Sequence, residues 1–359
     1  MAEKVLFLRF FEYILIMKII RTFAGILLIF SILFTIFIGG KKIADGYTFE
    51  KEQNYKGVIK IWQIDSFEGG KGSRKQFLLS VARGFEQQNQ GVLVMVISHT
   101  QESAEQAITQ GEIPDIISFG LGVELPSPMQ LHLKNSSLGG LVGDKSYAVS
   151  WCRGGYYLIS NPNLVGENSK ENTSKNEQTQ NKEKIEKIIV SKSEYTQPLV
   201  ALALEGVNAK NVECYPPLDA YVKFVSGKEK YFLGTQRDIV RLTNRGFNYS
   251  ATPLKNFNDL YQYACVTATD ENKKVYANAF LEYLLTEKVQ KRLTEIGMFS
   301  SFYTLDYQEK DFSNMQENNN FSTLSAFITK ENLKDLQIIA KQAVLGDNTQ
   351  LNKIKNALV

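Results

Sequence analysis

The sequence is poor in the residues that most often carry catalysis. Its 359 residues include only two histidines, His99 and His132, and three cysteines that form no C-x-x-C pair. Histidine is the commonest general base and zinc ligand, and a complete disulfide framework needs an even number of cysteines. The nucleophile elbow G-x-S-x-G, the zinc motif H-E-x-x-H and an EF-hand loop are also missing from the sequence. We therefore expect buried thiols, no metal site, no cofactor and no enzyme; an envelope hydrolase is the weakest hypothesis.

An excess of one charge is also missing. The chain carries 41 Lys and Arg against 38 Asp and Glu, a formal net charge of +3. Nucleic-acid binding needs a concentrated basic surface, so this balance argues against it. The 43% hydrophobic and 22% charged residues are typical of a folded globular protein, and the length is enough for two domains.

One long uncharged segment stands near the N-terminus: TFAGILLIFSILFTIFIGG, residues 22–40. At about 1.5 Å per residue, a helix of this length nearly spans a hydrocarbon core of about 30 Å. Four basic residues precede it: Lys4, Arg9, Lys18 and Arg21. The positive-inside rule then places the N-terminus in the cytoplasm and the bulk of the chain outside the cell.

This segment can be read as a permanent anchor or as a cleaved signal. Read from Met17, it has the basic and apolar regions of a signal peptide, so either Met1 or Met17 can be the start. No A-x-A cleavage site and no cysteine for lipid attachment follow it, which favours an uncleaved anchor. We expect residues 1–45 to form a cytoplasmic stub and signal anchor, which makes the protein a single-pass cell-membrane protein with an extracellular C-terminal bulk.

The chain beyond the anchor alternates between strand and helix patterns. Apolar runs at 57–64, 92–97 and 114–120 predict strands, and helical spacing predicts helices over about 73–88 and 103–110. This β-α-β-α-β order predicts an α/β fold with parallel strands and right-handed crossovers. The stretch 161–187 is rich in Asn, Lys, Glu, Ser, Thr and Gln, and we expect it to be a surface loop or disordered.

The turn DSFEGGKGSR, Asp65 to Arg74, joins the first strand to the first helix. Ligands of open parallel sheets bind beyond the carboxyl ends of the strands, so a site is expected here. Its glycines let the backbone approach a ligand, and the helix N-terminus near Ser73 offers free N–H groups. It matches neither a P-loop nor G-x-G-x-x-G, and a glycine-rich turn with solvated charges remains the alternative.

A second candidate is FLGTQRDIVR, residues 232–241, where an apolar stretch ends at Gly234. Gln236 and Arg237 are suited to hydrogen-bond hydroxyls or a carboxylate. Arg237 and Asp238 could equally form an ion pair at a helix cap. Trp151 stands at the end of an apolar strand, where it would either stack on a ligand ring or belong to the core.

In this order the segments resemble a known family. GVIKIWQIDSFEGGKGSRKQFLLSVARGFEQQNQGVLVMVISHT, followed by GEIPDIISFG, is similar to the N-terminal lobe of the maltose-binding-like solute-binding proteins of ABC importers. SYAVSWCRGGYYLISNPNL resembles the first hinge crossing and DLYQYACVTATDENKK the return crossing. KFVSGKEKYFLGTQRDI and ANAFLEYLLTEKVQKRLTEIGMF are similar to later family segments. The resemblance runs from about residue 57 to the C-terminus.

The resemblance implies a two-lobed periplasmic-binding-protein-like α/β fold with a hinge, preceded by the transmembrane helix at 22–40. Lobe I would comprise residues 55–150 and 262–300, and lobe II residues 151–261 and 301–359. The polar loop at 165–190 would replace a helical region of the family, and the segment from Gly206 to Tyr221 is much shorter than usual, so the second lobe would be pruned.

The resemblance also implies a function: a monomeric, membrane-tethered protein that captures a small solute, with a carbohydrate-like one favoured, for ABC permease subunits. Carried over by position, the ligand-binding residues would be Asp65, Glu68, Gly69, Ser73, Arg74, Phe119, Gly120, Trp151, Glu194, Tyr195, Gln236 and Arg237. The alternative is a non-transport envelope sensor or adaptor that binds a protein partner on the same scaffold.

Overall fold

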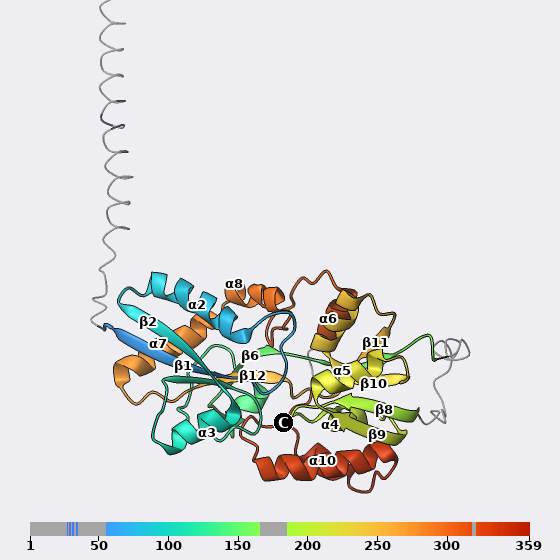
Figure 1. The fold of residues 1–359 in the computed structure, drawn as a ribbon. Helices are drawn as coiled ribbons and strands as arrows, with labels where there is room; N and C mark the ends of the chain where they lie inside the picture. Colours follow the sequence, from blue (N-terminus) through green and yellow to red (C-terminus); the bar gives the residue numbers. More distant parts are fainter. Residues whose placement is uncertain are drawn as a thin grey trace, which may run out of the picture. The chain divides into compact units, whose positions relative to one another are not determined.

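Two five-stranded sheets form the framework of residues 55–359 in the computed structural model (Figure 1). The structure describes residues 55–165, 185–317 and 321–359, together with Leu27, Ile29, Ser31 and Phe34. Residues 55–359 belong to one compact unit. We refer to the two sheets as the first sheet and the second sheet.

The first sheet contains the parallel strands that the sequence predicts. Its strand order is β2 (Val92–His99), β1 (Gly57–Ile64), β3 (Ile116–Phe119), β12 (Tyr261–Val266) and β6 (Val149–Arg153). β1 runs parallel to β2 and β3, whereas β12 is antiparallel to β3 and β6. Helix α2 (Arg74–Gln88) and helix α3 (Gln101–Thr109) connect these parallel strands, and Figure 1 shows them on opposite sides of the sheet. The first crossover leads from β1 to β2, and the second leads back past β1 to β3. Two right-handed crossovers that run in opposite directions along a sheet place their helices on opposite faces.

The second sheet has the order β11 (Ser250–Pro253), β7 (Tyr156–Ser160), β10 (Tyr231–Thr235), β8 (Ile185–Ser191) and β9 (Ala209–Tyr215). β8 lies parallel to β9 and β10, and β7 pairs antiparallel with β10 and β11. The prediction of a polar loop at 165–190 is wrong for its last part, because strand β8 begins at Ile185. The apolar residues at the end of that stretch, Ile188 to Val190, are fully buried. Residues 166–184 lie outside the described residues.

Helices complete each sheet. The first sheet is packed by α7 (Glu271–Leu284), which contacts β1, β12 and α2, and the chain continues through α8 (Glu287–Gln290) and η4 (Lys291–Ile296). The second sheet is packed by α5 (Pro217–Val225), α6 (Gln236–Arg245), α9 (Lys310–Gln316) and α10 (Lys330–Leu345). α10 also contacts α4 (Pro198–Leu204) and α11 (Leu351–Asn356). The remaining elements are η1 (Leu138–Gly140) and the hairpin β4 (Leu141–Val142) and β5 (Lys145–Ser146).

The chain crosses between the sheets on adjacent segments. It leaves the first sheet after Arg153 and enters the second at Tyr156, and it returns between Pro253 and Tyr261. The Gly154 amide donates to the Leu260 carbonyl at 2.6 Å, so these two crossings lie side by side. A Cβ on Gly154 would meet the Gln236 side chain at 2.7 Å, which explains a glycine at this close approach.

The predicted membrane span at 22–40 falls outside the described residues apart from Leu27, Ile29, Ser31 and Phe34, all of which are helical. Within the described part of the chain, no helix combines the length and apolar character needed to cross a membrane. The anchor therefore stays a prediction.

Candidate functional site

A cavity of about 1100 Å³ lies where the carboxyl ends of parallel strands from both sheets meet. The first sheet contributes the turn after β1 and the junction between β2 and α3. The second sheet contributes the segments that follow β8 and β9, and α10 contributes Gln337. Parallel strands leave their carboxyl ends free of strand-to-strand connections at one edge, so the loops there can carry a site.

The first-sheet wall is organised around Arg74 and Asp65. The Arg74 side chain is buried, and its Nε lies 2.8 Å from Asp65 Oδ1, which also accepts a 2.9 Å hydrogen bond from Gln63. The Arg74 guanidinium donates through Nη2 to the Phe67 carbonyl and lies 4.3 Å from the centroid of the Phe67 ring. Arg74 Nη1 is buried and has no hydrogen-bond partner among the described residues. The wall therefore contains a fixed cation with one unused donor.

The second-sheet wall carries Lys192 and Cys214. Lys192 follows β8 directly and is half-buried, and burial lowers the pKa of its ammonium group. No ion pair joins Lys192 to another described residue. Cys214 lies near the end of β9 and is exposed, contrary to the expectation of three buried thiols, although Cys152 and Cys265 are buried as expected.

Two of the four carboxylates in the cavity wall, Asp65 and Glu68, form ion pairs with arginines. Glu68 accepts two hydrogen bonds from Arg241 of α6, at 2.7 and 2.8 Å. Glu102 accepts from its own backbone N–H and from Thr100, and these bonds lower its pKa. Glu194 is exposed, and burial is the main cause that raises the pKa of the neighbouring Tyr195.

Six of the twelve predicted ligand residues line the cavity: Asp65, Glu68, Gly69, Arg74, Glu194 and Tyr195. They come from the turn after β1 and the segment after β8. The structure therefore brings together two segments that lie about 120 residues apart in the sequence.

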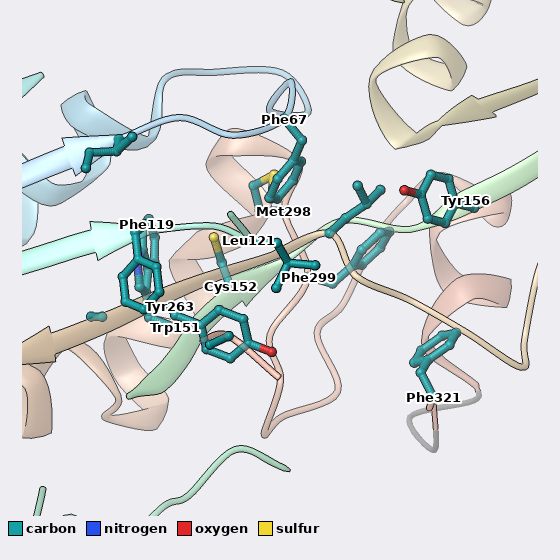
Figure 2. Close-up of a cluster of buried hydrophobic side chains, with 14 of the residues drawn as sticks. Phe67, Phe119, Leu121, Trp151, Cys152, Tyr156, Tyr263, Met298, Phe299 and Phe321 are labelled. Atoms are coloured by element: carbon teal, nitrogen blue, oxygen red, sulfur yellow. The ribbon is translucent and has the colours of Figure 1, made fainter. Parts of the chain in front are cut away.

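Four other predicted ligand residues serve the fold instead. Phe119 and Trp151 are fully buried and belong to the hydrophobic cluster of Figure 2, where the Phe119 ring lies 5.9 Å from the ring of Tyr263. Trp151 stacks on Phe77 at 5.7 Å and donates to Ser118 Oγ at 2.9 Å, so its ring is not available to a ligand. Ser73 is the N-cap of α2, and Gly120 is buried where a Cβ would meet Ser66 at 1.7 Å. These four do not line the cavity.

Gln236 and Arg237 also lie outside the cavity. Gln236 is fully buried, accepts from the Gly155 amide at 3.0 Å and so braces the first crossing. Arg237 Nη1 donates to the Gly70 carbonyl at 2.7 Å, which joins α6 to the turn of the first sheet. The helix-cap alternative is also corrected, because Asp238 forms a capping box with Thr235 and pairs with Arg241 instead of Arg237.

Sequence reasoning missed several residues of the cavity. They lie at the ends of β2 and β9 or directly after β2 and β8: His99, Thr100, Gln101, Lys192, Cys214 and Tyr215. His99, one of the two histidines of the sequence, lies in the wall beside Trp62, and burial lowers its pKa. For Lys192, Cys214 and Tyr215 the missing signal was the position of β8 and β9. His99, Thr100 and Gln101 stand at the end of the predicted strand at 92–97, so the rule that ligands bind beyond the carboxyl ends of parallel strands was the available signal for them.

No group of three or more His, Cys, Asp or Glu side chains in the described residues could hold a metal ion.

No protein-family model matches the chain, and no curated protein sequence matches it. Solved structures do match. The sugar-binding protein MalE from Xanthomonas citri has a TM-score of 0.54 at 14% identity, over 84% of this chain and 95% of that chain.

Two further structures match over similar lengths. The galacto-N-biose-/lacto-N-biose I-binding protein of an ABC transporter from Bifidobacterium longum has a TM-score of 0.54 at 12% identity, over 84% of this chain and 95% of that one. Iron-bound HitA from Pseudomonas aeruginosa has a TM-score of 0.51 at 12% identity, over 79% and 99%. The chain has the fold of ABC-transporter solute-binding proteins. The resemblance found in the sequence is thus confirmed for the solute-binding-protein fold, and at these identities it is the fold that is established.

Proposed function

We propose that this solute-binding-fold protein captures a small polar solute between its two sheets and releases it unchanged. The observation that carries the proposal is the cavity itself, because strand ends from both sheets build its walls and the crossings between the sheets lie side by side. Two lobes joined by such crossings can close on a ligand by a hinge movement. The volume of about 1100 Å³ is enough for a solute of sugar size.

The proposal also includes a membrane tether, ABC permease subunits as partners and a carbohydrate-like solute. The apolar segment at 22–40 would tether the protein to the cell membrane, with the bulk outside, and ABC permease subunits would receive the solute. A carbohydrate-like solute is in keeping with the sugar-binding structures that share the fold. Membrane fractionation, followed by protease treatment of intact cells, tests the tether and the outward orientation.

A thermal-shift screen of the full chain against sugars, amino acids and metal chelates tests solute capture, and calorimetry confirms each hit. Ser98→Trp fills the cavity from the end of β2, where the Ser98 side chain is exposed. Ser127→Trp, at an exposed loop position, is the matched control. We expect every hit to be lost in Ser98→Trp and kept in Ser127→Trp. Hits that survive in Ser98→Trp would show that the cavity is not the binding site.

A second candidate function is an envelope sensor or adaptor that binds a protein partner. It is supported by the direct bonds of α6 to the first-sheet turn, Arg241 to Glu68 and Arg237 to Gly70, which link the sheets without a solute. A screen without any hit, combined with a co-purifying envelope protein, would favour this candidate.

A further inference from the structure

Strand β2 forms one edge of the first sheet, and its two faces differ in exposure. Val92, Val94 and Val96 are buried, whereas Leu93 and Met95 between them are 60% and 48% exposed. Successive side chains of a strand point to opposite faces, so Leu93 and Met95 lie on the same face. Helices normally cover both faces of a parallel sheet, which makes an exposed apolar face here unusual.

This face is exposed because helix α3 is too short to cover it. Figure 1 shows α2 and α3 on opposite sides of the sheet. His99, which points to the same face as Leu93 and Met95, lies 3.2 Å from Ser103 of α3, so α3 is the helix on this face. The nine residues of α3 extend over about 14 Å, and the eight of β2 over about 26 Å. Because α3 begins directly after β2, it covers only the carboxyl half of the strand.

The neighbouring strand continues the exposed surface. Val58 of β1 is paired with Leu93, and Lys60 with Met95. Paired residues of adjacent strands point to the same face, where Val58 is half-buried and Lys60 exposed. Ile113, 48% exposed, lies at the same end of the sheet, just before β3. We call Val58, Leu93 and Met95 the amino-end patch.

The edge strand of the second sheet shows the usual alternative. β9 is also an edge strand, and its exposed residues are Lys210, Asn211 and Cys214. Polar and charged residues on an edge strand prevent unwanted association. The first sheet lacks this protection at Leu93 and Met95, so the amino-end patch is suited to contact with an apolar surface.

The chain enters the first sheet beside the amino-end patch. The Gly57 amide donates to the Gly91 carbonyl at 3.1 Å, which places the start of β1 next to the start of β2. Residues 41–54 connect this point to the apolar segment 22–40. Even fully extended, fourteen residues span at most about 50 Å. If residues 22–40 cross the membrane, the patch stays within this distance of the lipid, and a weak contact is enough at such an effective concentration.

The contact would depend on apolar side chains more than on charge. Lys56 and Lys60 are exposed at this end, but Glu112 is exposed there too. Two further acidic residues, Asp115 and Glu271, are paired with lysines of α7. Aliphatic side chains gain free energy on leaving water for the boundary between headgroups and acyl chains. We therefore expect contact with uncharged phosphatidylcholine as well as with anionic lipid.

We infer that the amino-end patch rests on the lipid surface of the membrane that residues 22–40 are proposed to span. This inference rests on the tether of the proposed function and is independent of solute capture. The cavity lies at the opposite, carboxyl ends of the same strands, so contact of the patch with lipid would leave the cavity open to solutes.

The test uses the full chain in phosphatidylcholine vesicles, with a nitrobenzoxadiazole label at Leu93→Cys. Cys214→Ser removes the exposed native thiol from every variant. Leu218→Cys, on α5 in the second sheet, is the matched control, because Leu218 is 57% exposed and Leu93 is 60% exposed. Emission is compared in vesicles with and without nitroxide-labelled phosphatidylcholine, and flotation of the vesicles reports the tether.

We expect the label at 93 to emit at shorter wavelength than the label at 218 and to be quenched several-fold more strongly by the nitroxide lipid. Met95→Glu, added to Leu93→Cys, should reduce this quenching, because a carboxylate is costly to move out of water. Both labelled proteins should melt within a few degrees of the wild type.

Equal quenching at 93 and 218 would overturn the membrane contact and leave the tether standing. A label at 93 that emits at shorter wavelength without being quenched would show that protein covers the patch, a second copy or another segment of the chain, and would overturn the contact as well. A chain that does not float with the vesicles would overturn the tether and the contact together. Solute capture is measured separately by the thermal-shift screen, so none of these outcomes decides it.

Discussion

The ion pair between Arg241 and Glu68 should have a stability cost that depends on which partner is removed. Arg241 has 17% of its side chain exposed and bonds both Glu68 and Asp238, whereas the Asp238 side chain is 0% exposed. Arg241→Met leaves a fully buried carboxylate without its cation. Glu68→Gln leaves Arg241 still paired with Asp238, and Glu68 itself is 32% exposed.

The magnitude follows from burial. Removing one partner of a buried charge pair typically costs about 3–5 kcal/mol, and an exposed pair contributes about 0–1 kcal/mol. Because Arg241 retains some exposure, we expect Arg241→Met to lower the free energy of unfolding by about 2–3 kcal/mol at pH 8. Glu68→Gln should lower it by about 1 kcal/mol or less.

The cost of Arg241→Met should also depend on pH. Burial raises the pKa of Asp238 to about 6, from 3.8. A carboxyl whose pKa is higher in the folded state binds more protons when folded, so its contribution destabilises the fold as pH rises from about 4 to above 6. At pH 5 Asp238 is largely protonated in the wild type and needs no cation. The gap between wild type and Arg241→Met should therefore widen from about 1 kcal/mol at pH 5 to its full value at pH 8.

Urea unfolding, followed by the fluorescence of the buried Trp62 and Trp151, measures these free energies by linear extrapolation. Arg245→Met, at an exposed position in the last turn of the same helix, is the matched control and should change stability by only a few tenths of a kcal/mol at either pH. An Arg241→Met gap that is equal at pH 5 and pH 8, or equal to that of Glu68→Gln, would refute the buried role of Asp238.

Two further predictions concern the thiols and the chain beyond the N-terminal segment. Iodoacetamide should modify Cys214 in the native protein while sparing Cys152 and Cys265, because burial raises the pKa of all three thiols but only Cys214 is exposed; peptide mass spectrometry gives the answer, and labelling of all three at equal rates would contradict the fold around them. The fragment 45–359 should be soluble and monomeric, because the longest uncharged apolar run of the sequence ends at residue 40; light scattering during size exclusion checks this, and a fragment that stays in solution only with detergent would count against the predicted anchor.

The first sheet could be predicted closely from the sequence because its strands are unbroken apolar runs separated by amphipathic helices. The turn from Asp65 to Arg74 could be placed at the site for the same reason, since it follows a parallel strand. β8 was hidden because it begins inside a long polar stretch, and a strand of seven residues gives little signal beside such a stretch. Lys192 was missed together with it.

The errors at Trp151 and Gln236 have a different origin. Both residues lie near the crossings, where a side chain can point to the cavity or into the core, and the sequence does not show which. Both faces of β6 are covered by packed elements, and Trp151 packs against Phe77 of α2, so its side chain enters the core. At α6 the capping box of Thr235 and Asp238 sets where the helix starts, which turns Gln236 inward and Asp238 into full burial. The Thr-x-x-Asp spacing is readable in the sequence and was the available signal.

The turn after β1 both lines the cavity and bonds helix α6, and different residues make these two sets of contacts. Asp65 and Arg74 face the cavity and bond each other within the first sheet, so this pair is independent of the second sheet. Glu68 and Gly70 bond α6, so these contacts exist only while the sheets are together. A solute would therefore meet a prearranged first-sheet wall, and the residues after β8 would add their contacts when the second sheet closes. Because the bonds of α6 favour closure without a solute, the solute need supply only the remaining part of the free energy of closure.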